Sequence, residues 1–326
     1  MHAWLCETLE GVDALTWKEL PTPAPAPGEV RIAIKAASLN FPDLLTVRGQ
    51  YQIKPPLPFV PGSEFSGVVD ALGAGVERLA LGQPVAAVGA SGGFGTHACV
   101  DAARTLALPS GFDIVDGAAF AFTYGTSYHA LLDRAALQPG ETVLVLGAAG
   151  GVGSAAVQIA KAAGARVIAA ASSDAKCAFC KELGADATID YTRTPLRDAL
   201  RTLTDGKGPD VVYDPVGGDL AEPVFRSIAW RGRYVVIGFT LGGIPALPWN
   251  LPLLKGASIV GVFWGEFVRR EPRASAAAMG ELMRWYAEGK VKPVVDRRLP
   301  MSELPTAYAR MGSRQVMGKV VLVNAW

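Results

Sequence analysis

Cysteine and histidine are scarce in this chain of 326 residues, which contains four cysteines and three histidines. A chain of this length does not need disulfide staples, so we expect its thiols to be reduced. Glu7 and Glu10 interrupt the N-terminus before any apolar run of signal-peptide length, which predicts a cytoplasmic protein. Cys177 and Cys180 have the spacing of a redox or zinc pair. However, a pair supplies only two of four zinc ligands, and this pair lies in a helix-patterned segment, so we interpret it as two thiols on a helix.

An excess of charge of one sign is also missing. The chain has 31 Lys and Arg residues against 30 Asp and Glu residues, with no basic block, so nucleic acid is not an expected partner. Two uncharged stretches, Thr142–Ala160 and Tyr234–Leu254, are long enough to cross a membrane, but glycines interrupt the first and prolines the second. We therefore expect no membrane span. Half of the residues are hydrophobic, and the length predicts about two compact domains.

The first 120 or so residues are rich in proline and glycine, with short runs of strand-forming residues between turns. Such runs are Val30–Lys35, Phe65–Asp70 and Pro84–Val88. This half of the chain predicts a small, mainly β domain.

From Glu141 onward, short apolar strands alternate with helical patterns. This alternation predicts an α/β, doubly wound parallel sheet of six strands, with helices on both faces. The expected strands are Thr142–Gly147, Arg166–Ala171, Ala187–Asp190, Asp210–Asp214, Tyr234–Gly238 and Ser258–Trp264. A helix over Ala274–Glu288 and a last strand over Val316–Val323 would then join the N-terminal domain.

A glycine-rich turn, Gly147-Ala-Ala-Gly150-Gly151-Val-Gly153, follows the first of these strands and opens a helix. A helix N-terminus offers free N–H groups and a positive dipole end, which suit a pyrophosphate. Gly150 would let the backbone approach the phosphates, and Gly153 would let the helix pack on the strand. The alternative is that the glycines serve helix–sheet packing alone, although their cost in backbone entropy argues against it. The turn predicts a dinucleotide site.

The end of the second strand predicts which dinucleotide binds. An NAD site places Asp or Glu there for the ribose hydroxyls, whereas this strand ends at Ser172 and Ser173, with Lys176 one helical turn further on. Hydroxyls and a cation suit a 2′-phosphate, which favours NADPH over NADH. Asp174 is either the missing acid or a first-turn helix residue stabilised by the helix dipole.

Motifs throughout the chain resemble the medium-chain dehydrogenase/reductase superfamily, and within it the zinc-free quinone oxidoreductase (zeta-crystallin-like) branch. They are Asn40–Asp43, Pro61–Gly67, Tyr124–Thr126, the Gly147–Gly153 turn, Asp214–Gly218 and Phe263–Gly265. The resemblance implies a GroES-like, mainly β catalytic domain over residues 1–122 and 265–326. It also implies a Rossmann domain over 123–264.

The zinc enzymes of that superfamily carry Cys where Asn40 stands and His where Ser63 stands, and no Cys or His lies between Val100 and Tyr128. No zinc site is therefore expected. Without a Lewis acid, hydride transfer favours acceptors that delocalise the arriving charge, namely quinones and α,β-unsaturated carbonyls. The resemblance thus implies an NADPH:quinone oxidoreductase that acts on a small-molecule quinone or enone.

The resemblance also assigns site residues. Asn40 and Tyr51 match positions that face the nicotinamide and the substrate, with Tyr51 as proton or hydrogen-bond donor unless it only packs a proline-rich loop. Thr126 matches a threonine near the nicotinamide, unless it merely caps a helix running to Leu132. The residues expected to bind the cofactor are Ala149, Gly150, Gly151, Val152, Gly153, Ser172, Ser173, Lys176, Tyr191, Gly238, Phe239, Phe263, Trp264, Gly265 and Arg314. Glu64 and Asp43 are interpreted as structural.

Two other functions stay open. One is an enoyl-CoA or enoyl-thioester reductase of the acryloyl-CoA reductase type, for which Arg269, Arg270 and Arg273 are candidate phosphate-binding residues. The other is a non-catalytic, crystallin-like NADPH-binding protein. The relatives commonly form homodimers or homotetramers through the sixth strand, and the apolar run Ile259–Val262 would need covering in any case, so we expect a homodimer.

Overall fold

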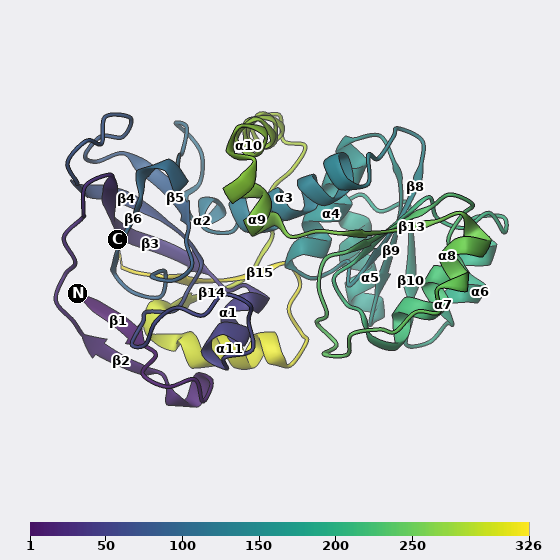
Figure 1. Cartoon of the computed structure of the whole chain (residues 1–326), viewed down its shortest axis with the longest axis horizontal. Helices are drawn as coiled ribbons and strands as arrows, with labels where there is room; N and C mark the ends of the chain where they lie inside the picture. Colours follow the sequence, from purple (N-terminus) through teal and green to yellow (C-terminus); the bar gives the residue numbers. More distant parts are fainter. Residues whose placement is uncertain (326) are drawn as a thin grey trace. The chain divides into compact units, whose positions relative to one another are not determined.

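The computed structural model describes residues 1–325, which form two compact units (Figure 1). Unit 1 comprises Met1–Phe122 and the C-terminal residues from Pro293 on, and unit 2 comprises Thr123–Lys292. The expected division placed residues 265–292 with the N-terminal domain. The structure places them in unit 2, where their apolar side chains pack.

Unit 2 is built on a parallel sheet with the strand order β10-β9-β8-β11-β12-β13. The predicted six-stranded, doubly wound sheet is therefore confirmed. The order reverses beside β8, so the carboxyl end of β8 lies at the switch point where open α/β sheets bind ligands. The strands are β8 (Thr142–Leu146), β9 (Arg166–Ala171), β10 (Ala187–Asp190), β11 (Val211–Asp214), β12 (Arg233–Val236) and β13 (Ser258–Gly261).

The central strands β8, β9 and β11 are mostly apolar and buried, as expected of strands that are covered on both faces. Leu144, Ile168 and Val212 are fully buried among helix residues such as Phe225. Gly164 has a φ of +81° at the end of the helix that follows β8, a left-handed helix end that glycine favours. The connecting helices are α4 (Gly151–Ala162), α5 (Asp174–Glu182), α6 (Leu196–Leu203), α7 (Ala221–Arg226) and α8 (Asn250–Lys255), with a short 3₁₀ turn, η4 (Gly218–Leu220).

The end of unit 2 differs from the expectation. The sixth strand ends at Gly261, and Trp264 opens helix α9 (Trp264–Arg270), which α10 (Pro272–Ala287) follows. The prediction that Phe263, Trp264 and Gly265 end a strand is therefore wrong. The tryptophan ring packs on Gly125, where an added Cβ would lie 2.7 Å from it, so the segment turns back onto the unit's own helices.

Those helices are α3 (Ala121–Tyr128) and a π-helical turn, η3 (His129–Arg134), that continues it. The ring of Phe267 stacks on His129 with centroids 3.9 Å apart, and Trp285 lies against Tyr128 at 5.7 Å. These contacts explain why residues 265–292 belong to unit 2. Thr126 lies inside α3, so the alternative that it caps a helix is wrong.

Unit 1 contains a seven-stranded sheet with the order β14-β15-β3-β4-β5-β7, to which β6 adds by pairing with β3, and a separate β1-β2 hairpin. The C-terminal strand β15 pairs with β3, as the prediction of a last strand joining this domain required. The strands are β1 (His2–Leu5), β2 (Thr16–Glu19), β3 (Glu29–Ser38), β4 (Glu64–Leu72), β5 (Pro84–Val88), β6 (His97–Asp101), β7 (Thr105–Ala107), β14 (Val295–Pro300) and β15 (Lys319–Val323). The helices are α1 (Phe41–Val47), α2 (Ile114–Gly117) and α11 (Leu304–Gly312), with 3₁₀ turns η1 (Val12–Ala14), η2 (Ala102–Arg104) and η5 (Met301–Glu303).

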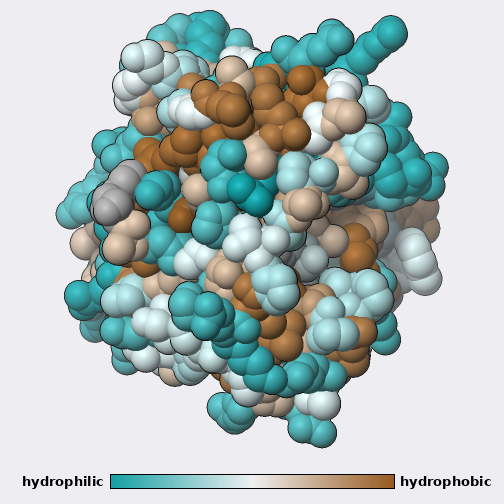
Figure 2. Space-filling view, turned by 90° about the vertical axis from the view of Figure 1, so that its left-hand side faces the viewer, coloured by the Kyte–Doolittle hydropathy of each residue, from teal (hydrophilic) through white to brown (hydrophobic). Residues whose placement is uncertain are grey.

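Figure 2 shows one face, on which hydrophobic residues gather in a patch near the upper edge and hydrophilic residues surround them. Among residues 1–325, no helix is both long and apolar enough to cross a membrane. The two uncharged stretches fold instead as strand, turn and helix within unit 2.

Candidate active site

The glycine-rich turn of unit 2 leads from β8 into α4 at the switch point of the sheet. Gly150 is the N-cap residue of α4, and no side chain caps this helix end. The first backbone hydrogen bond inside the helix runs from the N–H of Ser154 to the carbonyl of Gly150, at 2.8 Å. The N–H groups of Gly151, Val152 and Gly153 precede it, so they point out of the helix end and have no partner within the helix. This arrangement fits an anion such as a pyrophosphate.

Two glycines of the turn have different roles. A Cβ on Gly153 would lie 2.2 Å from the carbonyl oxygen of Gly147 and 2.8 Å from Cα of Ala148, so only glycine lets α4 pack this closely. A Cβ on Gly150 would meet nothing nearer than the carbonyl oxygen of Gly147, at 3.3 Å. Gly153 therefore serves the packing of helix on strand. Gly150 leaves space beside the helix end, as a bound phosphate group requires.

The end of β9 places hydroxyl groups and a cation together. Ser173 is the N-cap of α5, and its Oγ accepts a hydrogen bond from the backbone N–H of Lys176. The ammonium of Lys176 folds back and donates to Oγ of Ser172, at 3.2 Å. The structure therefore brings together Ser172, Ser173 and Lys176, which we predicted as a group that binds the 2′-phosphate.

Asp174, the alternative acid for the ribose hydroxyls, is paired with a basic side chain. Its carboxylate forms an exposed ion pair with Arg193, at 2.7 Å. It also lies in the first turn of α5, where the helix dipole stabilises an acid. Tyr191 follows β10, and its backbone N–H donates to the carbonyl of Ala171 at 3.1 Å, which holds it next to the end of β9.

The loop after β11 lies at the same carboxyl edge of the sheet. Its conformation depends on the buried carboxylate of Asp214, which accepts hydrogen bonds from the N–H groups of Val216 and Gly217 and from the hydroxyl of Tyr234. Gly217 has a φ of +65°, and a Cβ there would lie 2.7 Å from the ring of Phe239. The predicted cofactor residues Gly238 and Phe239 thus follow β12 beside this loop.

Helix α3 brings Thr126 to the same unit as the glycine-rich turn. The neighbouring Ser127 donates from Oγ to the carbonyl of Val152, at 3.0 Å, and is also bonded to the hydroxyl of Tyr213. The ring of Trp264 packs against Gly125, whereas Phe263 is about half exposed. Gly265 follows in the first turn of α9. Trp264 thus contacts α3, and none of the three residues ends a strand as predicted.

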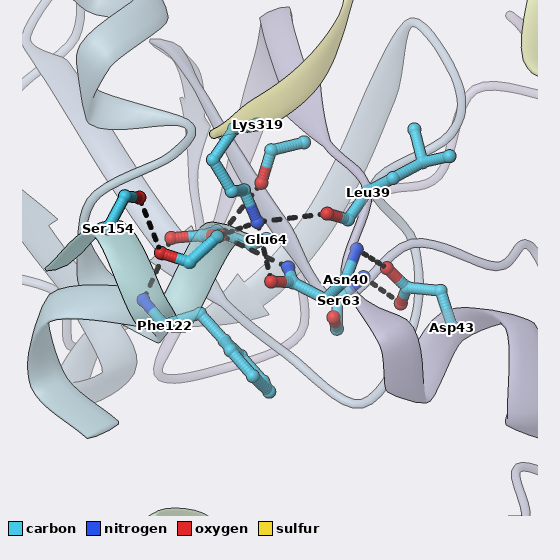
Figure 3. Close-up of polar contacts among 10 residues, drawn as sticks. Leu39, Asn40, Asp43, Ser63, Glu64, Phe122, Ser154 and Lys319 are labelled. Atoms are coloured by element: carbon cyan, nitrogen blue, oxygen red, sulfur yellow. Dashed lines mark hydrogen bonds and ion pairs between the residues drawn. The ribbon is translucent and has the colours of Figure 1, made fainter. Parts of the chain in front are cut away.

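Asn40, a candidate residue of unit 1, lies in a buried polar cluster (Figure 3). The side-chain oxygen of Asn40 accepts a hydrogen bond from the ammonium of Lys319, at 2.6 Å, and its side-chain nitrogen donates to Oε2 of Glu64, at 3.1 Å. Lys319 also donates to the carbonyl of Leu39 and lies 3.5 Å from Oε2 of Glu64. We name Asn40, Glu64 and Lys319 the buried triad.

Glu64 is fully buried, and both of its carboxylate oxygens have partners. Oε1 accepts from the backbone N–H of Phe122, at 2.8 Å, and Oε2 accepts from Oγ of Ser38, at 2.8 Å, as well as from Asn40. A buried carboxylate whose two oxygens both accept hydrogen bonds is typical of a structural carboxylate. This agrees with our interpretation of Glu64.

Asp43 fixes the backbone of the same region. Its carboxylate accepts hydrogen bonds from the N–H groups of Asn40, at 2.8 Å, and of Ser63, at 3.0 Å. Burial raises the pKa of Asp43 to about 6, although these hydrogen bonds and the charge of Lys319 act in the opposite direction. Asp43 thus joins the first turn of α1 to Ser63, directly before β4.

Tyr51 lies in the loop after α1 and is half-buried. Burial, and then the charge of Asp43, raise the pKa of its phenol. A raised pKa keeps the phenol protonated at neutral pH, so Tyr51 is able to donate a hydrogen bond or a proton.

Sequence reasoning missed Lys319. The only signal is one lysine at the start of an otherwise apolar strand, Lys319–Val323, and nothing in the sequence says that this strand pairs with β3 and buries the ammonium. Burial lowers the pKa of Lys319, while the charges of Glu64 and Asp43 oppose this. Arg314, which we expected to bind the cofactor, follows α11 in unit 1. Its role stays a prediction.

No three His, Cys, Asp or Glu side chains gather into a group that could hold a metal ion within residues 1–325. Cys177 and Cys180 are free and buried on α5, and burial raises the pKa of both thiols. Of the basic residues after Phe263, Arg269 and Arg270 both bind the carboxylate of Glu266, which offsets part of their charge.

Comparisons with known proteins agree with this geometry. The family model described as alcohol dehydrogenase GroES-like domain matches residues 26–128, and the one described as zinc-binding dehydrogenase matches residues 151–282. Quinone oxidoreductase-like protein 2 of Mus musculus is 37% identical over 322 residues, which cover 98% of this chain and 91% of the mouse protein.

Solved structures are similar over almost the whole length. The quinone oxidoreductase of Thermus thermophilus, also solved in complex with NADPH, has 34% identity and a TM-score of 0.87, with 99% of this chain and 100% of that chain covered. A structure described as an NAD-dependent alcohol dehydrogenase has 33% identity and a TM-score of 0.91, with both chains fully covered. The chain therefore belongs to the medium-chain dehydrogenase/reductase superfamily, in its quinone oxidoreductase branch. It is an oxidoreductase of that type, with a Rossmann-like sheet and a GroES-like, mainly β unit.

Proposed function

We propose that this protein is an NADPH-dependent oxidoreductase that reduces quinones, or similar α,β-unsaturated carbonyls, by direct hydride transfer. The observation that carries the proposal is the group at the end of β9, where Ser172 and Lys176 stand in place of an acidic residue. A carboxylate there would repel a 2′-phosphate, whereas an ammonium and a hydroxyl bind it.

The glycine-rich turn supports binding of the cofactor's pyrophosphate. The uncapped N–H groups of Gly151, Val152 and Gly153 supply donors, and the space beside Gly150 admits the phosphates. In this proposal Tyr191 and Arg314 add to the 2′-phosphate site. Gly238, Phe239 and the Phe263–Gly265 segment line the nicotinamide site.

NADPH supplies the hydride, so the protein must position the acceptor and stabilise the negative charge that develops on its oxygen. Quinones and enones need the least help, because a hydroquinone or enolate anion is delocalised. The chain offers hydrogen-bond donors of the kind this requires: the phenol of Tyr51, the carboxamide of Asn40 and the hydroxyl of Thr126. We assign Tyr51 as the proton donor, because the family resemblance places it beside the substrate and a tyrosine phenol is protonated at neutral pH.

The open edge of the sheet in unit 2 supports a homodimer. Among the described strands, β13 pairs only with β12, so its outer edge is unpaired. This edge carries Ile259, which is 42% exposed. Pairing with the same strand of a second copy would satisfy the free backbone groups and cover this apolar side chain.

An enoyl-thioester reductase is the alternative within the same fold. It requires a basic surface for the phosphates of the carrier, and Arg269, Arg270 and Arg273 are its candidates. Because Arg269 and Arg270 both bind Glu266 in the structure, part of this charge is already compensated, and the observations favour the quinone or enone reductase.

The test is to follow the oxidation of NADPH and of NADH at 340 nm with 1,4-benzoquinone, with a simple enone and with crotonyl-CoA. The proposal predicts turnover of the quinone or the enone with NADPH preferred. Preference for crotonyl-CoA would support the enoyl-thioester reductase instead. Absence of turnover with every acceptor would favour a non-catalytic, NADPH-binding protein.

Tyr51→Phe tests the proton donor. Loss of general acid catalysis lowers kcat for the enone by roughly 100-fold, with little change in NADPH affinity. Tyr308→Phe is the matched control, because Tyr308 is a buried tyrosine of the same unit whose hydroxyl has no hydrogen-bond partner in the described structure. Equal effects of the two substitutions would contradict the assignment.

A further inference from the structure

The two charged side chains of the buried triad, Lys319 and Glu64, are buried and have more hydrogen-bond partners than a surface ion pair would have. Only 5% of the Lys319 side chain and none of the Glu64 side chain is exposed. The three N–H groups of the ammonium match three acceptors: the carbonyl of Leu39, Oδ1 of Asn40 and Oε2 of Glu64. Burial of two charges usually adds little stability compared with an apolar pair, so the arrangement calls for another reason.

That reason lies in the carboxamide of Asn40. Its oxygen faces the cation of Lys319 and its nitrogen faces the anion of Glu64, at 2.6 and 3.1 Å. A flipped carboxamide would place N–H groups against the ammonium and the oxygen against the carboxylate, and both contacts would be repulsive. The two charges therefore permit one orientation only.

This orientation leaves one donor for a ligand. The side-chain nitrogen of Asn40 carries two N–H groups, of which one donates to Glu64, and no acceptor in the described structure takes the other. The backbone of Asn40 is fixed as well, because its N–H donates to Asp43. The second side-chain N–H is thus held in a constant direction.

We propose that Lys319 is a positioning residue that, with Glu64, locks the carboxamide of Asn40 so that its second N–H donates to the oxygen of the hydride acceptor. This inference rests on the proposed function and deepens it. In the step, the hydride adds to the acceptor carbon, the π electron pair moves to the oxygen, and the oxygen later takes a proton from Tyr51. The N–H group of Asn40 stabilises that oxygen while it is negative.

The charge balance of the triad fits this role. The charges of Lys319 and Glu64 cancel, so the pair orients the amide without adding a net charge. A net positive charge would itself attract the oxyanion, in competition with the N–H group of Asn40. Lys319→Met alone leaves a buried carboxylate without its cation and is expected to destabilise unit 1. The informative variant is therefore Lys319→Met combined with Glu64→Gln, which removes both charges and with them the lock.

The experiment compares four proteins: wild type, the double variant, Asn40→Ala and the triple variant that combines all three substitutions. For each protein it measures kcat, KM for 1,4-benzoquinone, Kd for NADPH and thermal unfolding. Removal of one donor to a developing oxyanion lowers kcat by about 100-fold, and loss of its orientation by roughly 10- to 100-fold. We expect kcat of the double variant to fall by this factor with KM and Kd unchanged. In the Asn40→Ala background the same two substitutions change kcat by less than about 3-fold, because the group they orient is gone. Lys319→Arg, which keeps the cation, retains most of the activity.

Each contrary outcome has a distinct meaning. A double variant as active as wild type, or one that loses the same factor in the Asn40→Ala background, overturns the positioning role. If the double variant fails to fold, Asn40→Ala decides alone, since a folded Asn40→Ala protein with wild-type kcat overturns the proposal. Wild type that oxidises NADPH with none of the acceptors overturns the proposed function itself, and this inference with it.

Discussion

Two glycines of the turn after β8 allow cofactor binding to be separated from folding. At Gly153 an added Cβ would lie 2.2 Å from the carbonyl oxygen of Gly147 and 2.8 Å from Cα of Ala148. Both contacts are with backbone, so α4 would have to move about 1 Å off the sheet to restore ordinary contact. Overpacking of this kind costs about 1–3 kcal/mol.

Gly150 has a φ of −78° and a ψ of 177°, which any residue adopts, and a Cβ there would lie 3.3 Å from its nearest neighbour. Replacement of a glycine N-cap by alanine costs about 1 kcal/mol or less. The added methyl group would, however, enter the space assigned to the pyrophosphate. We expect Gly150→Ala to raise the Kd for NADPH at least 10-fold, which corresponds to about 1.4 kcal/mol, while the unfolding temperature changes little.

The assay is titration of NADPH by its fluorescence, together with thermal unfolding, for both variants. Gly153→Ala should lower the unfolding temperature by several degrees. Gly280→Ala on α10 is the control, since a Cβ there meets nothing within 4 Å. It should leave the Kd for NADPH unchanged and should not lower the unfolding temperature, because alanine is the better helix former. Wild-type affinity of a folded Gly150→Ala protein would refute the placement of the pyrophosphate at this helix end.

Three further predictions follow from the structure. Lys176→Ala removes the ammonium beside Ser172, so kcat/KM for NADPH falls by about 10- to 100-fold while that for NADH stays the same; a parallel loss for both would show that Lys176 does not select the phosphate. Burial raises the pKa of Asp43 to about 6 from 3.8. The protonated carboxyl of Asp43 therefore stabilises the folded state at low pH, and about 3 kcal/mol of the free energy of unfolding is lost as the pH rises from 4 to above 6. In Asp43→Asn this difference between pH 4 and pH 7, measured by urea unfolding, should be absent. The same pH dependence in the variant as in wild type would contradict the prediction. Ile259→Asp on the β13 edge should convert the dimer to a monomer in light scattering, whereas a wild-type protein that is already monomeric would refute the proposed interface.

The sequence was sufficient to predict the elements of unit 2 that depend on local pattern. Strands β9 (Arg166–Ala171) and β10 (Ala187–Asp190) have the predicted bounds, because the period of a strand differs from that of an amphipathic helix. The packing role predicted for Gly153 is confirmed as well, since it follows from the geometry of a strand that turns directly into a helix.

Features that depend on distant contacts were not predictable. Trp264 was expected to end a strand, but it opens a helix because its ring packs on Gly125, far away in the sequence. The buried triad joins Asn40, Glu64 and Lys319 from three separate segments, and only the pairing of β15 with β3 and of β3 with β4 brings them together. The pattern of the sequence marks Lys319 only as a lysine in an apolar strand.

The most direct test of the account is quinone-dependent oxidation of NADPH at 340 nm by the purified protein, with and without an excess of EDTA. The account predicts turnover of 1,4-benzoquinone at the same rate in both conditions, because hydrogen bonds from the chain's own residues stabilise the charge on the acceptor. Loss of turnover in EDTA, restored by added Zn²⁺, would contradict it.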